Sequence, residues 1–155
     1  MATLYRVLLA LNGIKGPTFK QAGDSTLQPG YVATRDDSDE VKVATASDAR
    51  PYGVCGATSY MDLNTAVTAG RRIPIWLCGS GVDIMVLHDD DTGATTLIAG
   101  TKFIPDDANA GAVMLWAYTD TAVATDTMSG LVGRLLEDVT ISGDTPTFIP
   151  LKLSL

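Results

Sequence analysis

Runs of β-branched and aromatic residues recur along the chain about every ten residues, with clusters of Gly, Pro and Asp between them. This alternation predicts short strands joined by turns, because β-branched side chains suit a pleated sheet and Gly, Pro and Asp suit tight turns. The predicted strands are Leu4–Leu11, Thr18–Ala22, Tyr31–Thr34, Val41–Thr45, Gly53–Thr58, Arg72–Leu77, Val82–Leu87, Thr95–Ile98, Lys102–Ile104, Val113–Tyr118, Leu131–Leu136 and Thr147–Leu153. Their spacing is typical of a sandwich or a barrel.

Helix signals are weak by comparison. Asp106–Ala112 and Ser59–Ala66 have the length for one turn each, and neither carries a sustained apolar stripe of helical period. Pro74 and Pro150 lie inside predicted strands and cannot donate a ladder hydrogen bond, which favours edge strands or bulges there. We therefore expect an all-β fold, with a small β-barrel or β-tulip-like body and little helix.

The N-terminal segment differs from the other predicted strands because it is apolar on both faces, whereas a strand with one exposed face would alternate. Such a strand must be central in its own body, or be covered by a partner on its second face. We expect residues 1–12 to form an extended arm and residues 13–155 to form a single β-rich body. The arm's expected contact residues are Thr3, Leu4, Tyr5, Arg6, Val7, Leu8, Leu9 and Leu11. Thr119–Ser129, rich in Thr, Ala and Asp, is expected to be a long exposed loop.

A faint internal repeat links the two halves of the chain. The matching segments are Thr26–Gly30 with Thr96–Gly100, Asp36-Asp37 with Asp106-Asp107, Gly53–Gly56 with Gly130–Gly133, and Ile73-Pro74 with Ile149-Pro150. Two interpretations remain open. The body contains two related β-units over residues 26–77 and 96–153, or two turns of one kind reuse the same turn residues.

Composition narrows the class of protein. A chain of 155 residues with 46% hydrophobic and 19% charged residues is most simply one ordered domain. The net charge of −7 comes mostly from Asp, and the scattered Lys and Arg lack the basic footprint of a nucleic-acid binder. No apolar run approaches the ~20 residues that a membrane span needs, and no secretory signal is recognisable. We expect a soluble, unsecreted chain that binds neither nucleic acid nor membrane.

Candidate chemistry centres on the single histidine. His88 precedes Asp89–Asp91, which suggests a metal site or an acid–base pair, but one histidine cannot supply a multi-histidine site and the spacing does not fit a calcium loop. A solvated turn is the simpler interpretation, with weak Ca²⁺ binding at Asp89–Asp91 or Asp36–Glu40 as the alternative. Ser80 lies between two glycines without the pattern of a nucleophile elbow. We therefore expect no enzymatic activity, no catalytic residues, no bound metal and no cofactor.

A few further residues stand out as candidate contacts. Arg71 and Arg72 form a basic doublet that could grip an acidic partner or keep an edge strand soluble. Trp76 and Trp116 lie in apolar strands and are expected to be core or subunit contacts. Cys55 and Cys78, the only two cysteines, are expected to be buried thiols, with a bridge possible if their strands are neighbours.

One stretch of the chain resembles a known family. The pattern runs from Leu27 and Gly30 through the strand Val41-Lys42-Val43-Ala44, then Arg50-Pro51-Tyr52-Gly53-Val54, Ala69-Gly70, Ile73-Pro74-Ile75-Trp76 and Gly79-Ser80-Gly81-Val82. Residues 26–86 thereby resemble the head decoration, or capsid cement, proteins of tailed viruses such as bacteriophages.

The resemblance implies a structural virion protein that trimerises and sits on the exterior of an icosahedral capsid at three-fold and quasi-three-fold points. It would be made in the host cytoplasm and would clamp the major capsid protein against internal pressure, with the N-terminal arm adding to a capsid sheet. Two other functions remain as alternatives. One is a virion or cell-surface adhesion or fibre β-domain that binds a glycan or receptor. The other is a small trimeric all-β nucleotide hydrolase.

Overall fold

The computed structural model describes residues 16–45, 50–57, 61–89, 94–116, 130–142 and 145–154. The expected N-terminal arm, with its strand Leu4–Leu11, and the expected loop Thr119–Ser129 lie outside these residues.

The described residues form twelve strands and no helix, so the predicted all-β class is confirmed. The strands are β1 Thr18–Gln21, β2 Val32–Arg35, β3 Val41–Val43, β4 Pro51–Cys55, β5 Arg72–Leu77, β6 Asp83–His88, β7 Ala94–Leu97, β8 Lys102–Pro105, β9 Val113–Leu115, β10 Gly133–Leu135, β11 Val139–Ser142 and β12 Thr147–Lys152. β11 was not among the predicted strands. Asp106–Ala112 and residues 61–66, the described part of the candidate turn Ser59–Ala66, form turns and bends and not helical turns.

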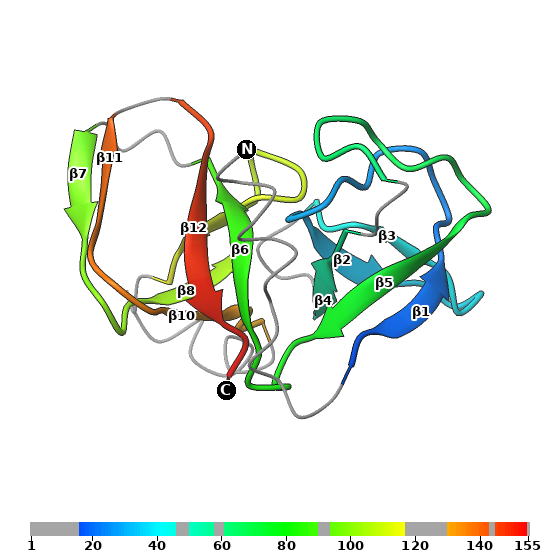
Figure 1. The fold of residues 1–155 in the computed structure, drawn as a ribbon, viewed down its shortest axis with the longest axis horizontal. Coiled ribbons are helices and arrows are strands. Elements are labelled where there is room, and N and C mark those ends of the chain that lie inside the picture. Colours follow the sequence, from blue (N-terminus) through cyan, green and yellow to red (C-terminus); the bar gives the residue numbers. More distant parts are fainter. Residues whose placement is uncertain are drawn as a thin grey trace.

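The strands form two bodies, side by side in Figure 1. The first is a five-stranded sheet in the order β1-β5-β4-β2-β3, curled so that Ala22, just after β1, makes a parallel bridge to Val41 in β3. The second is a closed barrel in the order β10-β12-β6-β9-β8, with a two-stranded ribbon of β7 and β11 beside it. In the barrel, His88 of β6 and Val113 of β9 make the parallel contact.

The two bodies share one topology. The strand order β1-β5-β4-β2-β3 of the first matches the order β6-β12-β10-β8-β9 of the second, position by position. In chain order, the second unit therefore repeats β1, β2, β3, β4 and β5 as β6, β8, β9, β10 and β12. The registers agree as well. Ala33 in β2 pairs with Val43 and Gly53, and Phe103 in β8 pairs with Leu115 and Gly133. The structure therefore contains the same five-strand unit twice, the first over residues 18–77 and the second over residues 83–152.

Individual hydrogen bonds repeat between the units. Gly30 N–H donates to the Cys55 carbonyl at 2.7 Å, and Gly100 N–H donates to the Leu135 carbonyl at 2.8 Å. Gly30 and Gly100 also share a left-handed backbone, with φ of 87° and 86°. Such a φ favours glycine, which explains why this residue type recurs at the same point of both turns.

The pairing corrects one detail of the sequence repeat. Gly53 corresponds to Gly133, and not to Gly130 as the sequence match suggested. The physical reason is steric, since a Cβ at Gly53 would collide with the backbone carbonyl of Trp76, and one at Gly133 with that of Lys152. Both glycines allow a neighbouring strand to approach closely.

The prolines inside strands also differ from expectation. Pro74 and Pro150 lie in β5 and β12, each of which has a neighbouring strand on both sides, so the expected edge position is wrong. The proline carbonyls still accept hydrogen bonds, from Gly56 N–H at 2.8 Å and Leu136 N–H at 3.0 Å. Gly56 and Leu136 follow directly after β4 and β10. Each proline therefore lies opposite the end of the neighbouring strand, where its lack of an N–H removes no hydrogen bond of the ladder.

Two clusters of buried residues form the core. The smaller one lies inside the first unit and includes Leu27, Ile73 and Ile75. The larger one fills the second unit and also contains Val32 and Val54 from the first. The two units therefore share a continuous apolar core across their contact, here called the seam.

Candidate functional site

The seam is built by a turn of the first unit seated on strands of the second. The Gly30 turn, residues Gln28–Tyr31, lies against β6 and β12, and Leu87 N–H donates to the Gly30 carbonyl at 2.9 Å. A Cβ at Gly30 would collide with the ring of Phe148 and approach the Met85 carbonyl to 3.3 Å. The turn therefore fits its site only with glycine at this position.

A loop of the second unit completes the seam. Val32 N–H donates to the Gly111 carbonyl at 2.8 Å, and Gly111 N–H donates to the Ala44 carbonyl at 2.8 Å. A Cβ at Gly111 would collide with the Tyr31 ring. The seam thus joins different surfaces of the two units. The first contributes its turn and the start of β2, and the second contributes β6, β12 and the loop at Gly111.

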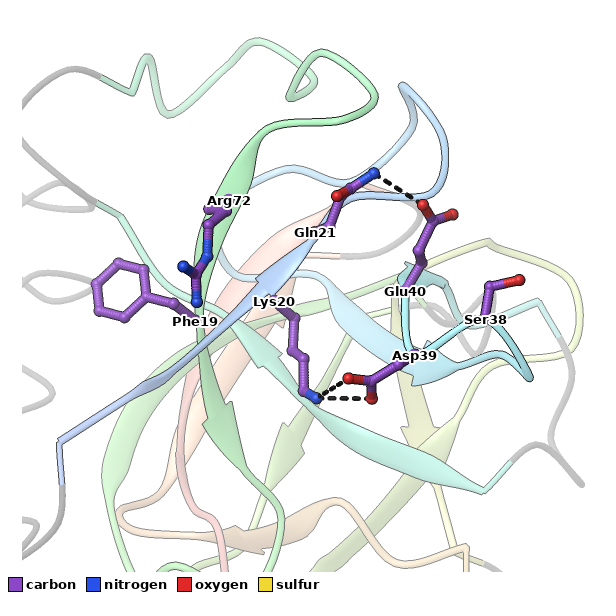
Figure 2. A pocket seen from close by; sticks show the side chains of 7 residues that line it. All are labelled: Phe19, Lys20, Gln21, Ser38, Asp39, Glu40 and Arg72. Carbon is purple, nitrogen blue, oxygen red and sulfur yellow. Dashed lines mark hydrogen bonds and ion pairs between the residues drawn. The ribbon is translucent and has the colours of Figure 1, made fainter.

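A hollow opens on the first unit beside β1, as Figure 2 shows. It has a volume of about 450 Å³ and is called here the Phe19 hollow. Its lining residues are Phe19, Lys20, Gln21, Ser38, Asp39, Glu40 and Arg72. They come from β1, from the first residue of β5 and from the turn between β2 and β3.

Polar side chains brace one wall of the Phe19 hollow. Lys20 Nζ lies 2.6 Å from one Asp39 carboxylate oxygen, and Gln21 Nε2 donates to Glu40 at 2.8 Å. Arg35 also contacts Asp39, at 2.5 Å. The hydrogen bond from Lys20 is the main cause that holds the pKa of Asp39 below its ordinary value. The turn that carries Asp39 is thereby fixed against β1.

The opposite wall is apolar and cationic. Phe19 is 45% exposed, which is unusual for a large apolar side chain in a strand, and Arg72 lies on the same side in Figure 2 and is exposed as well. Asp39 stands across β1 with a left-handed backbone, at φ of 64°. This combination of an apolar ring, a guanidinium and a braced carboxylate can recognise a partner with apolar and charged groups.

A second exposed apolar feature lies on the second unit. The Gly100 turn, residues Ile98–Thr101, carries Ile98 at 64% exposure, and the adjoining Leu136 is 37% exposed. Ala99 N–H donates to the carboxylate of Asp138 at 2.8 Å, which ties the turn to the start of the ribbon strand β11. The position of Gly100 is open, because a Cβ there would have no atom within 4 Å.

The sequence-predicted contact residues fall in different places. Arg72 lines the Phe19 hollow, whereas Arg71 lines a separate hollow of about 230 Å³ together with Met61 and Asp62. Trp76 is half-buried and packs against the larger core. Trp116 is half-buried in the second unit, with the Lys102 ammonium 4.6 Å from its ring centre. The expected arm residues lie outside the described residues.

The interpretation as a solvated turn is wrong for His88, whereas Asp90 and Asp91 of the expected turn and calcium site lie outside the described residues. His88 is the last residue of β6, is 2% exposed, and meets the Phe103 ring edge-on at a centroid distance of 5.8 Å. It corresponds to the buried Ala22 of the first unit. The acidic residues that follow it directed the sequence interpretation to solvent, while strand pairing and the ring contact place the imidazole inside.

The proposed calcium loop at Asp36–Glu40 is organised by its own hydrogen bonds. One Asp36 carboxylate oxygen accepts Ser38 N–H at 2.9 Å and Glu40 N–H at 3.1 Å, and the other lies 2.9 Å from Lys42 Nζ. Asp106 repeats the turn in the second unit by accepting Ala108 N–H at 2.7 Å. Within the described residues, no cluster of three or more potential ligands could hold a metal ion.

Both cysteines are free thiols. Burial raises the pKa of Cys55 and of Cys78 to about 12, so the reactive thiolate form is scarce at neutral pH. Cys55 is the last residue of β4 and pairs with Ile75 of the neighbouring strand β5, whereas Cys78 follows directly after β5. The described part of the chain contains no helix able to cross a membrane.

No model of a known protein family matches this chain, and no curated protein is similar enough to it to count as a relative.

The sequence pointed to Arg72 as a contact residue but not to Phe19, Ile98 or Leu136. The repeat held a signal for one of them, since Ile98 stands where the first unit has the polar Gln28. An apolar residue at a turn tip is a reason to expect a contact.

Proposed function

We propose that this protein is a structural virion protein that binds the outside of an icosahedral capsid and stabilises it against internal pressure. The observation that carries the proposal is architectural. Leu27, Gly30 and Gly53, on which the resemblance to capsid decoration proteins rests, are the residues that build the first unit and its seam. The motif is therefore a fold motif, and the fold is of the small all-β kind that the resemblance implies.

The chemistry of the described surface supports a binding role. Asp24, Asp36, Asp62 and Asp106 each accept a backbone N–H two residues further on, so these carboxylates shape turns. The large exposed apolar side chains stand on the Phe19 hollow and beside the Gly100 turn. The carboxylates fix the loops, and the exposed apolar side chains are free to contact a partner. Both features favour a binding role.

In this proposal the partner is the major capsid protein, and three copies of the chain act together at each three-fold or quasi-three-fold site. The arm of residues 1–12 adds a strand to a capsid sheet, which gains main-chain hydrogen bonds and buries apolar side chains on both faces. The net charge of −7 keeps the protein soluble until it meets the capsid exterior. No cofactor, nucleic acid or membrane takes part.

The first test is co-sedimentation with undecorated capsids of the virus that carries this chain. The full protein should pellet with the capsids, and the L8D variant should stay in the supernatant because a charge enters the apolar arm. S142D, which adds the same charge at an exposed position of β11, serves as the matched control and should pellet. Failure of the full protein to pellet would exclude capsid decoration.

The alternative function, adhesion to a glycan, requires exposed aromatic rings on the surface, because sugars stack on such rings. Trp76 and Trp116 are half-buried, and Trp76 packs against the core. Neither ring therefore offers a free face of the usual kind. A glycan array distinguishes the two functions, since capsid decoration predicts no signal and adhesion predicts a saturable one.

A further inference from the structure

The seam joins the two units head to tail, and this has a geometric consequence. The first unit uses a turn face, formed by the Gly30 turn, and the second uses a strand face, formed by β6, β12 and the loop at Gly111. Because the units share one fold, the first unit also has a strand face and the second also has a turn face. The seam occupies neither of these.

The strand face of the first unit is found from the registers. Pro74 pairs with Phe19 and Pro150 pairs with Met85, so Phe19 corresponds to Met85. By the same pairings the other strand-face residues Leu87, Phe148 and Gly111 correspond to Gln21, Arg72 and Asp39. All four counterparts line the Phe19 hollow. The hollow is therefore the strand face of the first unit.

Burial distinguishes the occupied strand face from the open one. Met85 is 5% exposed under the Gly30 turn, whereas Phe19 is 45% exposed. The backbone shape is nevertheless kept, since Asp39 and Gly111 both have positive φ, at 64° and 82°. A residue other than glycine rarely adopts this conformation, so its retention at Asp39 preserves the form of the face.

The turn face of the second unit is the Gly100 turn. Its backbone matches that of the Gly30 turn in φ and in the hydrogen bond to the neighbouring strand. Pro29 and Gly30 are buried in the seam, whereas Ala99 and Gly100 are exposed. Ile98 replaces Gln28 at the tip, so the open turn offers more apolar surface than the occupied one.

We propose that the Phe19 hollow of one copy of this chain receives the Gly100 turn of a second copy, in an interface that repeats the seam between molecules. The Gly100 carbonyl accepts the N–H of Gln21, as the Gly30 carbonyl accepts that of Leu87. Ala22 N–H donates to the carbonyl of Arg71, which directly precedes β5, so it points towards β5. Successive N–H groups of a strand point to opposite sides. The N–H of Gln21 therefore points away from β5, towards the incoming turn.

Side-chain chemistry is complementary across this contact. Ile98 and Leu136 of the incoming copy meet the ring of Phe19, and the three are the large apolar side chains most exposed in the described chain. Arg72 on the hollow faces a turn whose Ala99 N–H is hydrogen-bonded to the carboxylate of Asp138. The occupant is therefore a second copy of the chain, because the chain itself carries the shape that fits.

Contacts of this head-to-tail kind close into a ring when the rotation between successive units divides a full turn. The inference deepens the proposed function, in which three copies act together. A closed trimer then consists of six five-strand units in a ring, with seams inside and between chains in alternation.

The test measures the mass of the full chain in solution by light scattering, over a range of concentrations and without capsids. The wild type should form trimers, while F19D and I98D should each be monomeric with unchanged circular dichroism. R72E provides a second disruption of the hollow should F19D fail to fold, and S142D is the control that should remain trimeric. A monomeric wild type, or an I98D protein that keeps the wild-type mass, would overturn the proposal.

A mixture of two variants tests whether the interface is head to tail. F19D keeps its turn face and I98D keeps its strand face, so an equimolar mixture should give a one-to-one complex that grows no further. An interface between identical faces would give no such complementation, and a mixture that stays monomeric contradicts the head-to-tail arrangement. Because no capsid is present, failure here is distinct from failure of the capsid-binding proposal.

Discussion

Gly30 and Gly100 have the same backbone conformation, with φ of 87° and 86°, but opposite surroundings. Gly30 is pressed against the Phe148 ring in the seam, and Gly100 has open space around it. The same turn thus serves as an internal contact in one unit and as an exposed surface in the other.

This difference predicts unequal effects of alanine. G100A should cost about 1 kcal/mol of the free energy of unfolding, because alanine is strained at positive φ. G30A should cost about 1–3 kcal/mol more, because its Cβ also overpacks the seam. Urea denaturation measures both values, and the monomeric F19D background removes any contribution from association. Equal costs would contradict the described seam.

Gly53 and Gly133 should behave alike. In each, a new Cβ would collide with a backbone carbonyl of the neighbouring strand, which cannot rotate away as a side chain can. G53A and G133A should each lower the free energy of unfolding by about 1–3 kcal/mol in urea denaturation. A Cβ added at Gly16 would have no atom within 4 Å, so G16A is the matched control and should leave stability unchanged within error.

Acid should weaken the turn between β2 and β3. The hydrogen bond from Lys42 is the main cause that lowers the pKa of Asp36 from its ordinary value of 3.8, with the N–H groups of Glu40 and Ser38 contributing. A lowered folded-state pKa means that the contribution to stability is present above pH 3.8 and is lost as the pH falls through the folded pKa. Carbon-detected NMR titration should place the pKa of Asp36 below 3.8 in the wild type and closer to it in K42M. An identical Asp36 pKa in the two proteins would exclude the ion pair as the cause.

The thiols should resist modification in the folded protein. Burial raises the pKa of both cysteines to about 12, so almost no thiolate is present at neutral pH. A chromogenic disulfide reagent should react slowly with native protein and at once with two thiols in denaturant. Cys78 should react before Cys55, because Cys78 is half-buried and Cys55 is fully buried. The variants C55S and C78S assign the two phases.

Local pattern predicted most strands well, and Arg72–Leu77 has the same bounds in sequence and structure. β11 was missed because Val139–Ser142 is short and gains strand character only by pairing with β7. The repeat was readable at Gly30 and Gly100, where positive φ demands glycine in both units. At Gly53 and Gly133, glycine is required because a carbonyl of another strand lies close by, and no local sequence pattern shows this contact.

The candidate surface was harder to predict than the fold. The burial of β1 alternates as in any half-exposed strand, so Phe19 stands out only when its counterpart Met85 is known to be covered. His88 was misplaced for a related reason, because its burial depends on Phe103 and on a parallel contact to Val113. These features arise from packing between segments distant in sequence.

The proposed stabilisation of capsids can be measured as the temperature at which capsids rupture. Undecorated capsids are heated with saturating wild-type protein, with L8D or with no addition, and DNA release is followed by dye fluorescence. If the protein stabilises capsids, the rupture temperature should rise with the wild type and should not shift with L8D. A rupture temperature that the wild-type protein leaves unchanged would contradict the proposed stabilisation.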